Sequence, residues 1–450
     1  MSYKETTTRS SSLMLRLAFS VLIIGVAAAS YPLQAQSFSS LDRERARGML
    51  SVIKGDIKKN YYDPTFHGID LDARFKTAEE KIKTVDSLGL AYGVIAQVLS
   101  EFNDSHLFFF PPPRPAHPDY GWRMQMIGND CLIVGVKPGS DAEEKGLKPG
   151  DRVLKVDGFE PTRDNLWKME YRYNVLRPQA GIQVVVQTAK EEPRPLDLKA
   201  KIIQGKRRLD FTGDSGSEDI EAVLREINEG EHLRRHRYLE SGDLFIWKMP
   251  QFDMENEQVD DMMNKAAKHK ALILDLRGNG GGAEPTLQRL IGNLFDHEIK
   301  VADLKRRKET KPIVAKSRGK DIFKGQLIVL VDSGSASASE VFARVVQLEK
   351  RGTVIGDQSK GAVMRSQGYS YEMGANSILF YGASITDADA IMADGKSLEH
   401  VGVTPDELVL PTPADLAAQR DPVLSRAAEI AGVKLDSAKA GTLFPLEWKK

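Results

Sequence analysis

The chain has very little cysteine, because Cys131 is the only one among 450 residues. A single thiol excludes an internal disulfide and any metal cluster built from the cysteines of one chain. The chain also lacks net charge, since 63 Lys and Arg balance 63 Asp and Glu. No global charge therefore points to nucleic acid or to an anionic membrane surface as a partner. The fold must rest on hydrophobic cores, and the partner has to be inferred from a site.

Long apolar runs are absent beyond the N-terminus, where basic residues precede LAFSVLIIGVAAAS. This run has the length of a signal h-region and falls short of the roughly 20 residues that a membrane-spanning helix needs. We therefore expect residues 1–35 to be a signal peptide, with small residues from Ala27 to Ser30, or Ala35, as cleavage sites. The protein would then be exported, to the periplasm or the extracellular space, while an uncleaved segment would anchor it to a membrane.

Hydrophobic periodicity predicts how the rest of the chain is organised. Apolar residues recur every three and four positions from Ser40 to about Glu101, which indicates helices, and the prolines of FNDSHLFFFPPPRPAHPD end this region. A β-rich segment with RVLKVDG and GIQVVVQTAK follows. After a charged linker, continuous apolar strands such as ALILDLRG and QLIVLVD alternate with amphipathic helices. This alternation predicts an α/β core with a mainly parallel sheet.

The predicted divisions are a signal peptide (1–35), a helical N-terminal region (40–118), a β-rich domain (119–203), a linker (204–240), an α/β core (241–412) and a C-terminal tail (413–450).

Two stretches of the core carry residues suited to chemistry. VDSGSASASEVF places Ser335, Ser337 and Ser339 between a strand and a helix, where free N–H groups await an anion. A serine here could be a nucleophile, or Ser339 could simply cap the helix. LILDLRGNGGGAE runs from a buried strand into a glycine-rich loop, which could stabilise an oxyanion, hold a phosphate or form a tight turn. It is not a phosphate-binding P-loop, because no Gly-Lys-Ser/Thr follows.

The order of four motifs resembles a known family. DLRGNGGG, VDSGSASASEVF, GDQSKG and LEHVGVTPD follow one another as in the C-terminal processing (tail-specific) peptidases and the tricorn core serine peptidases. The segment from Tyr120 to about Lys201 resembles the PDZ domain of such enzymes, and the likeness extends from about Ser40 to Leu410. It implies an α/β protease core of the ClpP/crotonase type, a β-rich PDZ-like domain and a helical N-terminal region that carries a Ser-His motif.

The resemblance implies that Ser337 is the nucleophile. By the same match, the oxyanion hole is formed by the backbone N–H of Ala338 and one from Gly281 or Gly282. These roles agree with the chemistry, since a serine nucleophile needs a base and preorganised donors for the tetrahedral intermediate.

The base has two candidates. Processing peptidases use a lysine in a segment resembling TFGKG; aligned on Gly356 and Gly361, this chain has Ala362 at the lysine position and Lys360 two residues earlier. A two-residue shift would move the lysine ammonium beyond hydrogen-bond reach of the nucleophile. Lys360 would then be a solvated loop residue. The tricorn-like branch uses a histidine from a serine-histidine pair, which His106 and its neighbour Ser105 match. An imidazole near neutral pKa suits proton transfer.

A carboxylate would complete this second constellation. Glu399, which precedes the GV.PD motif, is the best candidate to orient the imidazole or to organise the proton network through Ser105. Rivals in nearby loops are Asp387, Asp389 and Asp394. His400 also lies in this motif, and we read it as a surface residue.

The PDZ-like segment implies recognition of an extended chain end. PDZ domains add a peptide as a strand along a sheet edge and capture its terminal carboxylate. The carboxylate loop and first strand fall on YGWRMQMI, so the candidate peptide-binding residues are Tyr120, Gly121, Trp122 and Arg123. The alternative is a packing module that only gates the active site.

The sequence therefore predicts an exported serine endopeptidase that cuts polypeptides near their C-termini or in unfolded segments. No metal or organic cofactor is implied, and no nucleic-acid partner; an activating or adaptor protein remains open. One alternative is the same protease with Lys360 as the base of Ser337. Another is an inactive protein that uses the PDZ-like domain and the cleft to bind peptides or hydrophobic ligands. A nucleotide-binding protein is a distant third.

Overall fold

The computed structural model describes residues 38–114, 116–204, 236–374 and 378–448. The predicted signal peptide and most of the predicted linker lie outside the described residues. Ser39–Lys450 form one compact unit. In this described part of the chain, no helix has both the length and the apolar character that crossing a bilayer requires.

Three helices form the N-terminal region, as the periodicity predicts. They are α1 (Ser40–Asn60), α2 (Leu71–Thr84) and α3 (Leu88–Ser100), with the 3-10 turn η1 (Phe66–Gly68) after α1. Each helix begins after a side chain that accepts an N–H of the first turn: Ser39, Asp70 and Ser87. The short strand β1 (Phe108–Phe110) then pairs with β17 (Leu379–Met392). The segment with the Ser-His motif is thus anchored by α3 on one side and by β1 on the other.

The β-rich segment folds into an antiparallel sheet in which neighbours in sequence pair in the order β3-β4-β5-β6-β7. Its strands are β3 (Trp122–Ile127), β4 (Asp130–Val136), β5 (Arg152–Val156), β6 (Gly181–Gln187) and β7 (Arg194–Lys199). The helices of this segment are α4 (Asp141–Glu144), α5 (Leu166–Tyr171) and the short π-helix η2 (Arg172–Leu176). A separate strand pair is formed by β2 (Ala116–Asp119) and β8 (Lys201–Gln204). The sheet has its own hydrophobic core around Ile133 and Val184. β3 lies at its edge, so one side of this strand has no strand partner in the sheet.

The α/β core contains the predicted parallel sheet, with strand order β18-β15-β14-β11-β10-β9. All these neighbours pair in parallel except β9 with β10. The strands are β9 (Arg237–Ser241), β10 (Leu244–Lys248), β11 (Ala271–Asp275), β14 (Gln326–Val331), β15 (Thr353–Gly356) and β18 (Glu407–Leu408), and the helices are α7 (Asn256–Ala266), α8 (Glu284–Gly292) and α9 (Ala338–Leu348), with the turn η3 (Gly319–Asp321). The fold class read from the sequence is therefore confirmed.

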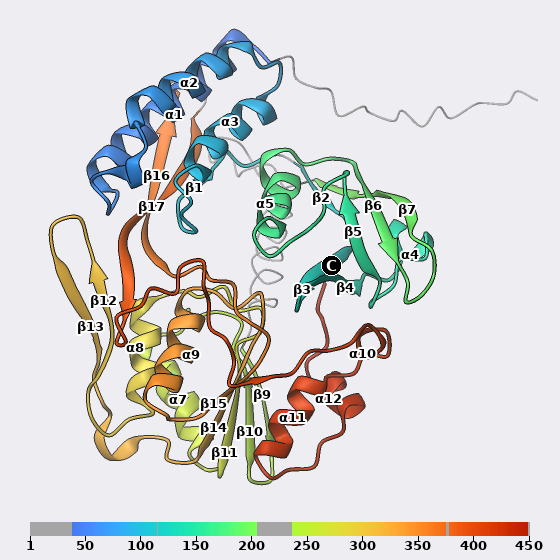
Figure 1. The fold of residues 1–450 in the computed structure, drawn as a ribbon, viewed down its shortest axis with the longest axis vertical. Coiled ribbons are helices and arrows are strands. Elements are labelled where there is room, and N and C mark those ends of the chain that lie inside the picture. Colours follow the sequence, from blue (N-terminus) through green and yellow to red (C-terminus); the bar gives the residue numbers. More distant parts are fainter. Residues whose placement is uncertain (1–37, 115, 205–235, 375–377, 449–450) are drawn as a thin grey trace, which may run out of the picture. The chain divides into compact units, whose positions relative to one another are not determined.

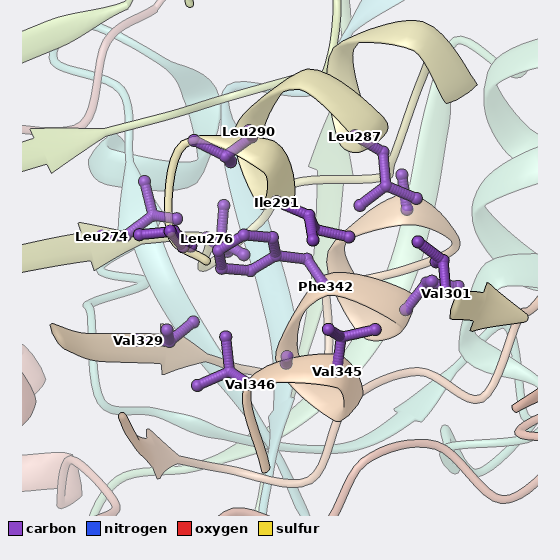
Figure 2. Close-up of a cluster of buried hydrophobic side chains, with 14 of the residues drawn as sticks. Leu274, Leu276, Leu287, Leu290, Ile291, Val301, Val329, Phe342, Val345 and Val346 are labelled. Carbon is purple, nitrogen blue, oxygen red and sulfur yellow. The ribbon is translucent and has the colours of Figure 1, made fainter. Parts of the chain in front are cut away.

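Both faces of this sheet are covered, which explains its continuously apolar strands. Leu272 and Leu274 of β11 point toward α7, α8 and α9. Figure 2 shows side chains from α8 and α9, among them Phe342, directed toward those of the sheet. Ala271 and Ile273 point to the opposite face, because side chains alternate along a strand.

The C-terminal residues cover that opposite face. The segment predicted as a tail forms α10 (Pro413–Ala417), α11 (Pro422–Ile430) and α12 (Ser437–Leu443) (Figure 1). Leu424 and Ala427 of α11 are buried against the sheet in the cluster of Ile273. Helices α11 and α12 are therefore packed onto the core and are not a free tail.

A second sheet was not predicted from the sequence. It is antiparallel and contains β12 (Ile299–Lys305), β13 (Thr310–Ala315), β16 (Met364–Met373), β17 and β1. β17 pairs with β1, β12 and β16 along its length. Through β17, the N-terminal region and the α/β core share one sheet across the boundary predicted between them.

Candidate active site

Ser337 lies at the sharp turn between β14 and α9. Its backbone is in an unusual conformation for a non-glycine residue, with φ 55° and ψ −119°. Its N–H donates to the carbonyl of Ala362 at 2.8 Å and to Glu340 Oε2 at 3.0 Å. Such strained strand-to-helix turns persist where the surroundings hold them, and they project a nucleophile from the backbone.

The other two serines of the motif hold this turn against the glycine-rich loop. Ser335 Oγ donates to the carbonyl of Leu276 at 2.8 Å, and Ser339 Oγ donates to that of Asn279 at 2.9 Å. Both serines are fully buried. Of the three hydroxyls, that of Ser337 is therefore the one placed to react.

His106 lies beside Ser337 although 231 positions separate them, and its Nε2 is 3.3 Å from Ser337 Oγ. Its Nδ1 is 2.9 Å from Ser105 Oγ, which donates to Glu399 Oε2 at 2.8 Å. Since Ser105 has one hydroxyl proton and gives it to Glu399, its oxygen accepts from His106. Nδ1 then carries the imidazole proton, and the lone pair of Nε2 faces Ser337.

Glu399 is held firmly in this arrangement. Its Oε1 accepts the N–H of Ser105 at 2.8 Å, and its Oε2 accepts that of Val363 at 2.8 Å. Burial raises the pKa of the Glu399 carboxyl, and these hydrogen bonds oppose the rise. The predicted triad and Ser105 thus come together from the N-terminal region, α9 and the loop after β17.

Burial also controls the base. It lowers the pKa of His106 to about 4, assisted by the positive charge of Lys360, while the negative charge of Asp104 acts in the opposite direction. The imidazole is therefore neutral near pH 7, the form that can accept a proton from Ser337.

The structure keeps the three rival acids out of this network, whereas the Nε2 of His400 lies 3.5 Å from Glu399 Oε1. Asp387 pairs with Arg306 and Arg365, Asp389 accepts from Ser397, and Asp394 pairs with Arg344. The exposed His400 makes a 2.8 Å hydrogen bond to the carbonyl of Asn103.

Lys360 is also not a member of this hydrogen-bonded network. It is exposed, and its backbone N–H donates to the carbonyl of Ser335 at 3.0 Å. Ala362, which takes the lysine position of the processing-peptidase pattern, is buried next to Ser337. Within the described ranges, no hydrogen bond joins Lys360 to the nucleophile.

The glycine-rich loop approaches Ser337 closely. A Cβ on Gly281 would lie 2.6 Å from Ser337 Cβ, and Gly281 has φ +98°, so only glycine fits. The N–H of Gly281 donates to Asn279 Oδ1 at 2.8 Å. Ala338 is the first residue of α9, where a helix leaves its N–H groups without intrahelical acceptors.

The four predicted peptide-binding residues lie apart from this network, at the start of β3. Tyr120, Trp122 and Arg123 line a cavity of about 1520 Å³ together with Gly278 and Lys360. Tyr120 and Gly121 are engaged with their own domain through Gln179 and Lys137. Arg123 instead contacts the C-terminal segment, where it donates to the carbonyl of Glu447 at 2.9 Å and stacks 4.8 Å from the Trp448 ring centroid.

Sequence reasoning did not identify Glu340 or Asp104 as site residues. Glu340 is fully buried and accepts from Ser359 Oγ, Gly361 N, Ala362 N and Ser337 N. Its position three residues after Ser337 matches the spacing of a helix capping box, which could have marked it. No local signal distinguishes Asp104, because its partners come from distant elements.

Comparison with known proteins gives one family and several similar chains. The model of Peptidase family S41 matches residues 245–409. The carboxy-terminal processing protease CtpA of Bacillus subtilis is 23% identical over 402 residues, which are 87% of this chain and 76% of that protein. A probable CtpA-like serine protease of Staphylococcus haemolyticus is 26% identical over 295 residues, 64% of this chain and 51% of its own length.

Solved structures support the fold. Mature CPAF matches with a TM-score of 0.62 at 15% identity, covering 84% of this chain and 95% of CPAF. The photosystem II D1 C-terminal processing protease matches with a TM-score of 0.50 at 19% identity, covering 82% and 93%. The resemblance read from the motifs and the α/β protease fold are thereby confirmed.

Proposed function

We propose, from the match of the Peptidase family S41 model to residues 245–409 and the likeness to a carboxy-terminal processing protease, that this serine-type peptidase is an exported endopeptidase of that family, with Ser337 as nucleophile and His106 as general base. It cleaves polypeptides near their C-termini or in unfolded segments. The observation that carries this proposal is the continuous hydrogen-bonded chain from Ser337 through His106 and Ser105 to Glu399.

The reaction follows from this proton arrangement. His106 Nε2 takes the hydroxyl proton of Ser337 while Oγ attacks the scissile carbonyl carbon. The imidazolium then gives the proton to the leaving amine as the C–N bond breaks, which leaves an acyl-enzyme. Water, deprotonated by the same nitrogen, hydrolyses the ester and restores Ser337.

Two backbone N–H groups stabilise the oxyanion, those of Ala338 and Gly282. Gly281 is less suitable, because its N–H is already bonded to Asn279. The N–H of Phe252 donates to the carbonyl of Gly281, and the carbonyl of Phe252 accepts the N–H of Ala283. Since N–H groups alternate along an extended segment, the N–H of Gly282 points away from Phe252.

A histidine base has more support than a lysine base. Ala362 stands where the processing-peptidase lysine is expected, and the Ala362 carbonyl bonds the N–H of Ser337. The exposed Lys360 lines the cavity, whereas His106 lies within reach of the nucleophile.

The substrate class rests on the PDZ-like domain and on the relatives. The Bacillus subtilis relative is named a carboxy-terminal processing protease. The edge strand β3, beginning at Trp122, can take a peptide as an added strand, with Tyr120, Gly121 and Arg123 beside its end. The cavity next to β3 reaches the glycine-rich loop at Gly278. Export rests on the predicted signal peptide, and an activating or adaptor protein remains compatible with this reading.

Covalent labelling tests the proposal. The purified mature protein and its Ser337→Ala, His106→Ala and Lys360→Ala variants are treated with a fluorophosphonate and analysed by intact mass and peptide mapping. We expect a label on Ser337 that survives Lys360→Ala and is lost in His106→Ala. The reverse pattern would make Lys360 the base. No labelling and no cleavage of an unfolded protein substrate would favour a binding protein.

A further inference from the structure

Asp104 lies two residues before His106 and is only 6% exposed. Its Oδ1 accepts the backbone N–H of His106 at 2.9 Å and the hydroxyl of Thr386 at 2.7 Å. Its Oδ2 accepts the hydroxyl of Tyr61 at 3.0 Å. The Asp104 carboxylate therefore connects the turn that carries His106 to Thr386 of β17 and to Tyr61, which directly follows α1.

The partners of Asp104 are themselves fixed. Tyr61 and Thr386 are both fully buried. Burial, together with the charge of Asp104, raises the pKa of the Tyr61 hydroxyl far above its usual value, so this hydroxyl always donates. Three neutral donors thus satisfy Asp104, and no cationic side chain forms an ion pair with it in the part of the chain that the structure describes.

A charge in this position needs a reason. A buried carboxylate without a cation loses solvation that neutral donors only partly replace. The turn alone would be served by asparagine, whose amide oxygen accepts the same N–H two residues on. Aspartate differs from asparagine here in its negative charge and in the second oxygen that accepts the Tyr61 hydroxyl.

The charge acts on His106. Burial and the positive charge of Lys360 both lower the pKa of the imidazole, and Asp104 is the group that raises it. Glu399 is also titratable and reaches the imidazole through the Ser105 hydroxyl. Farther out lie the neutral hydroxyls of Tyr61 and Tyr62, His67 beside both hydroxyls, and His400 between the Asn103 carbonyl and Glu399. When His106 takes the proton of the nucleophile, Asp104 favours the resulting cation.

We propose that Asp104 is a positioning residue of the peptidase reaction: it fixes the backbone of His106 and supplies the negative charge that supports the imidazolium. Glu399 and Asp104 then both prepare His106 to act as the base, each in a different way. Glu399 sets the tautomer through Ser105, while Asp104 sets the place and the electrostatic environment of the ring. This inference rests on the proposed function. It extends that function to a residue outside residues 245–409, the range that the family model matches.

The experiment compares pH profiles of Ser337 labelling by a fluorophosphonate in the wild type and in Asp104→Asn. Asparagine keeps the turn acceptor, removes the charge and places an NH₂ group opposite the Tyr61 hydroxyl. We expect the labelling rate at pH 7 to fall on the order of tenfold, the effect of about one pKa unit of lost stabilisation, and the acid limb of the profile to move to lower pH. A wild-type rate with an unmoved acid limb would overturn the proposal.

Two further variants separate charge from geometry. Thr386→Val keeps the charge and removes one donor to Oδ1, so the plateau rate should fall while the acid limb stays in place. This variant also tests the positioning role if Asp104→Asn does not fold; an unchanged rate in folded Thr386→Val would contradict it. Asp394→Asn is the control, because Asp394 pairs with Arg344 and forms no hydrogen bond or ion pair with His106 or with the partners of Asp104 among the described residues; its profile should equal that of the wild type.

The proposed function can fail separately. If wild-type Ser337 is not labelled, or if His106→Ala labels normally, the histidine mechanism itself is wrong and Asp104 has no such role. If the wild type depends on His106 and Asp104→Asn behaves like the wild type, only the inference on Asp104 is wrong.

Discussion

The hydrogen-bonded network around Ser337 and the cavity beside β3 are built in opposite ways. In the network, Glu340 accepts four donors, and Glu399 and Asp104 accept three each. The cavity of about 1520 Å³ is lined by side chains such as Trp122 and Met124. The indole N–H of Trp122 is buried without a hydrogen-bond partner among the described residues.

The difference matches the roles proposed for the two regions. Attack on one carbonyl carbon requires atoms fixed to a fraction of an ångström, which several hydrogen bonds per side chain provide. Binding chain ends of varied sequence requires room and apolar contacts, with few fixed polar groups. We expect changes in the network to alter the rate of Ser337 acylation, and changes at the cavity to leave that rate nearly intact.

The largest effect is expected for Glu399→Gln. In glutamine, an NH₂ group replaces one of the two carboxylate oxygens. This group faces the donors from Ser105 and Val363 and cannot accept from them, so the tautomer of His106 is no longer fixed. We expect kcat/KM for a fluorogenic peptide to fall about 10³-fold, within the range for a disrupted triad carboxylate. The control is Asp394→Asn, a surface acid paired with Arg344, which should stay close to the wild type. Equal losses in both variants would point to a nonspecific effect.

Glu340→Gln should cost the most stability. Of the four donors that meet this buried carboxylate, two would face an amide NH₂ group, and each unsatisfied buried donor costs about 1–3 kcal/mol. We expect the free energy of unfolding in urea to drop by about 4 kcal/mol. Glu349→Gln, at the exposed end of the same helix, provides the matched control. A small loss in Glu340→Gln would show that the loop of Ala362 is held in another way.

The pH dependence of stability reports on His106. Its pKa is lowered to about 4 in the folded protein, against about 6.5 in an unfolded chain. Between these values the unfolded state binds the extra proton, so stability falls as the pH drops from about 6.5 to about 4, by up to about 3 kcal/mol. The difference in urea midpoint between the wild type and His106→Gln measures this contribution. A difference that stays constant over this window would mean that the imidazole is not desolvated.

The sequence predicts best where one segment determines its own structure. The apolar runs of β11 and β14 are buried, and helix α8 between them buries its apolar face, as their patterns indicate. β17 was missed because it pairs with three different strands, and its mixed polar sequence is decided by those partners. The helices after residue 412 were missed although Pro413 and Pro422 stand at first helical positions, a recognised start signal.

The candidate site shows the same limit. Ser337, His106 and Glu399 could be named from motif order, and the structure brings them within hydrogen-bonding distance through Ser105. Asp104 adjoins the same motif but could not be singled out, because Tyr61 and Thr386 lie 43 and 282 positions away. A residue whose role depends on several distant partners has no local pattern to reveal it.

The smallest effect is expected at the cavity, for Arg123→Ala. Arg123 stacks on Trp448 and bonds the carbonyl of Glu447, so its loss should remove about 1 kcal/mol from the attachment of the C-terminal segment to β3. Fluorophosphonate labelling of Ser337 should change less than about twofold, the effect of ~0.4 kcal/mol, whereas the fluorescence of Trp448 should shift toward that of an exposed indole. Arg152→Ala, in β5 of the same sheet and paired with Asp130, should change neither. A labelling rate that falls as far as in Glu399→Gln would mean that the C-terminal segment and β3 control the nucleophile, and the division between network and cavity would not hold.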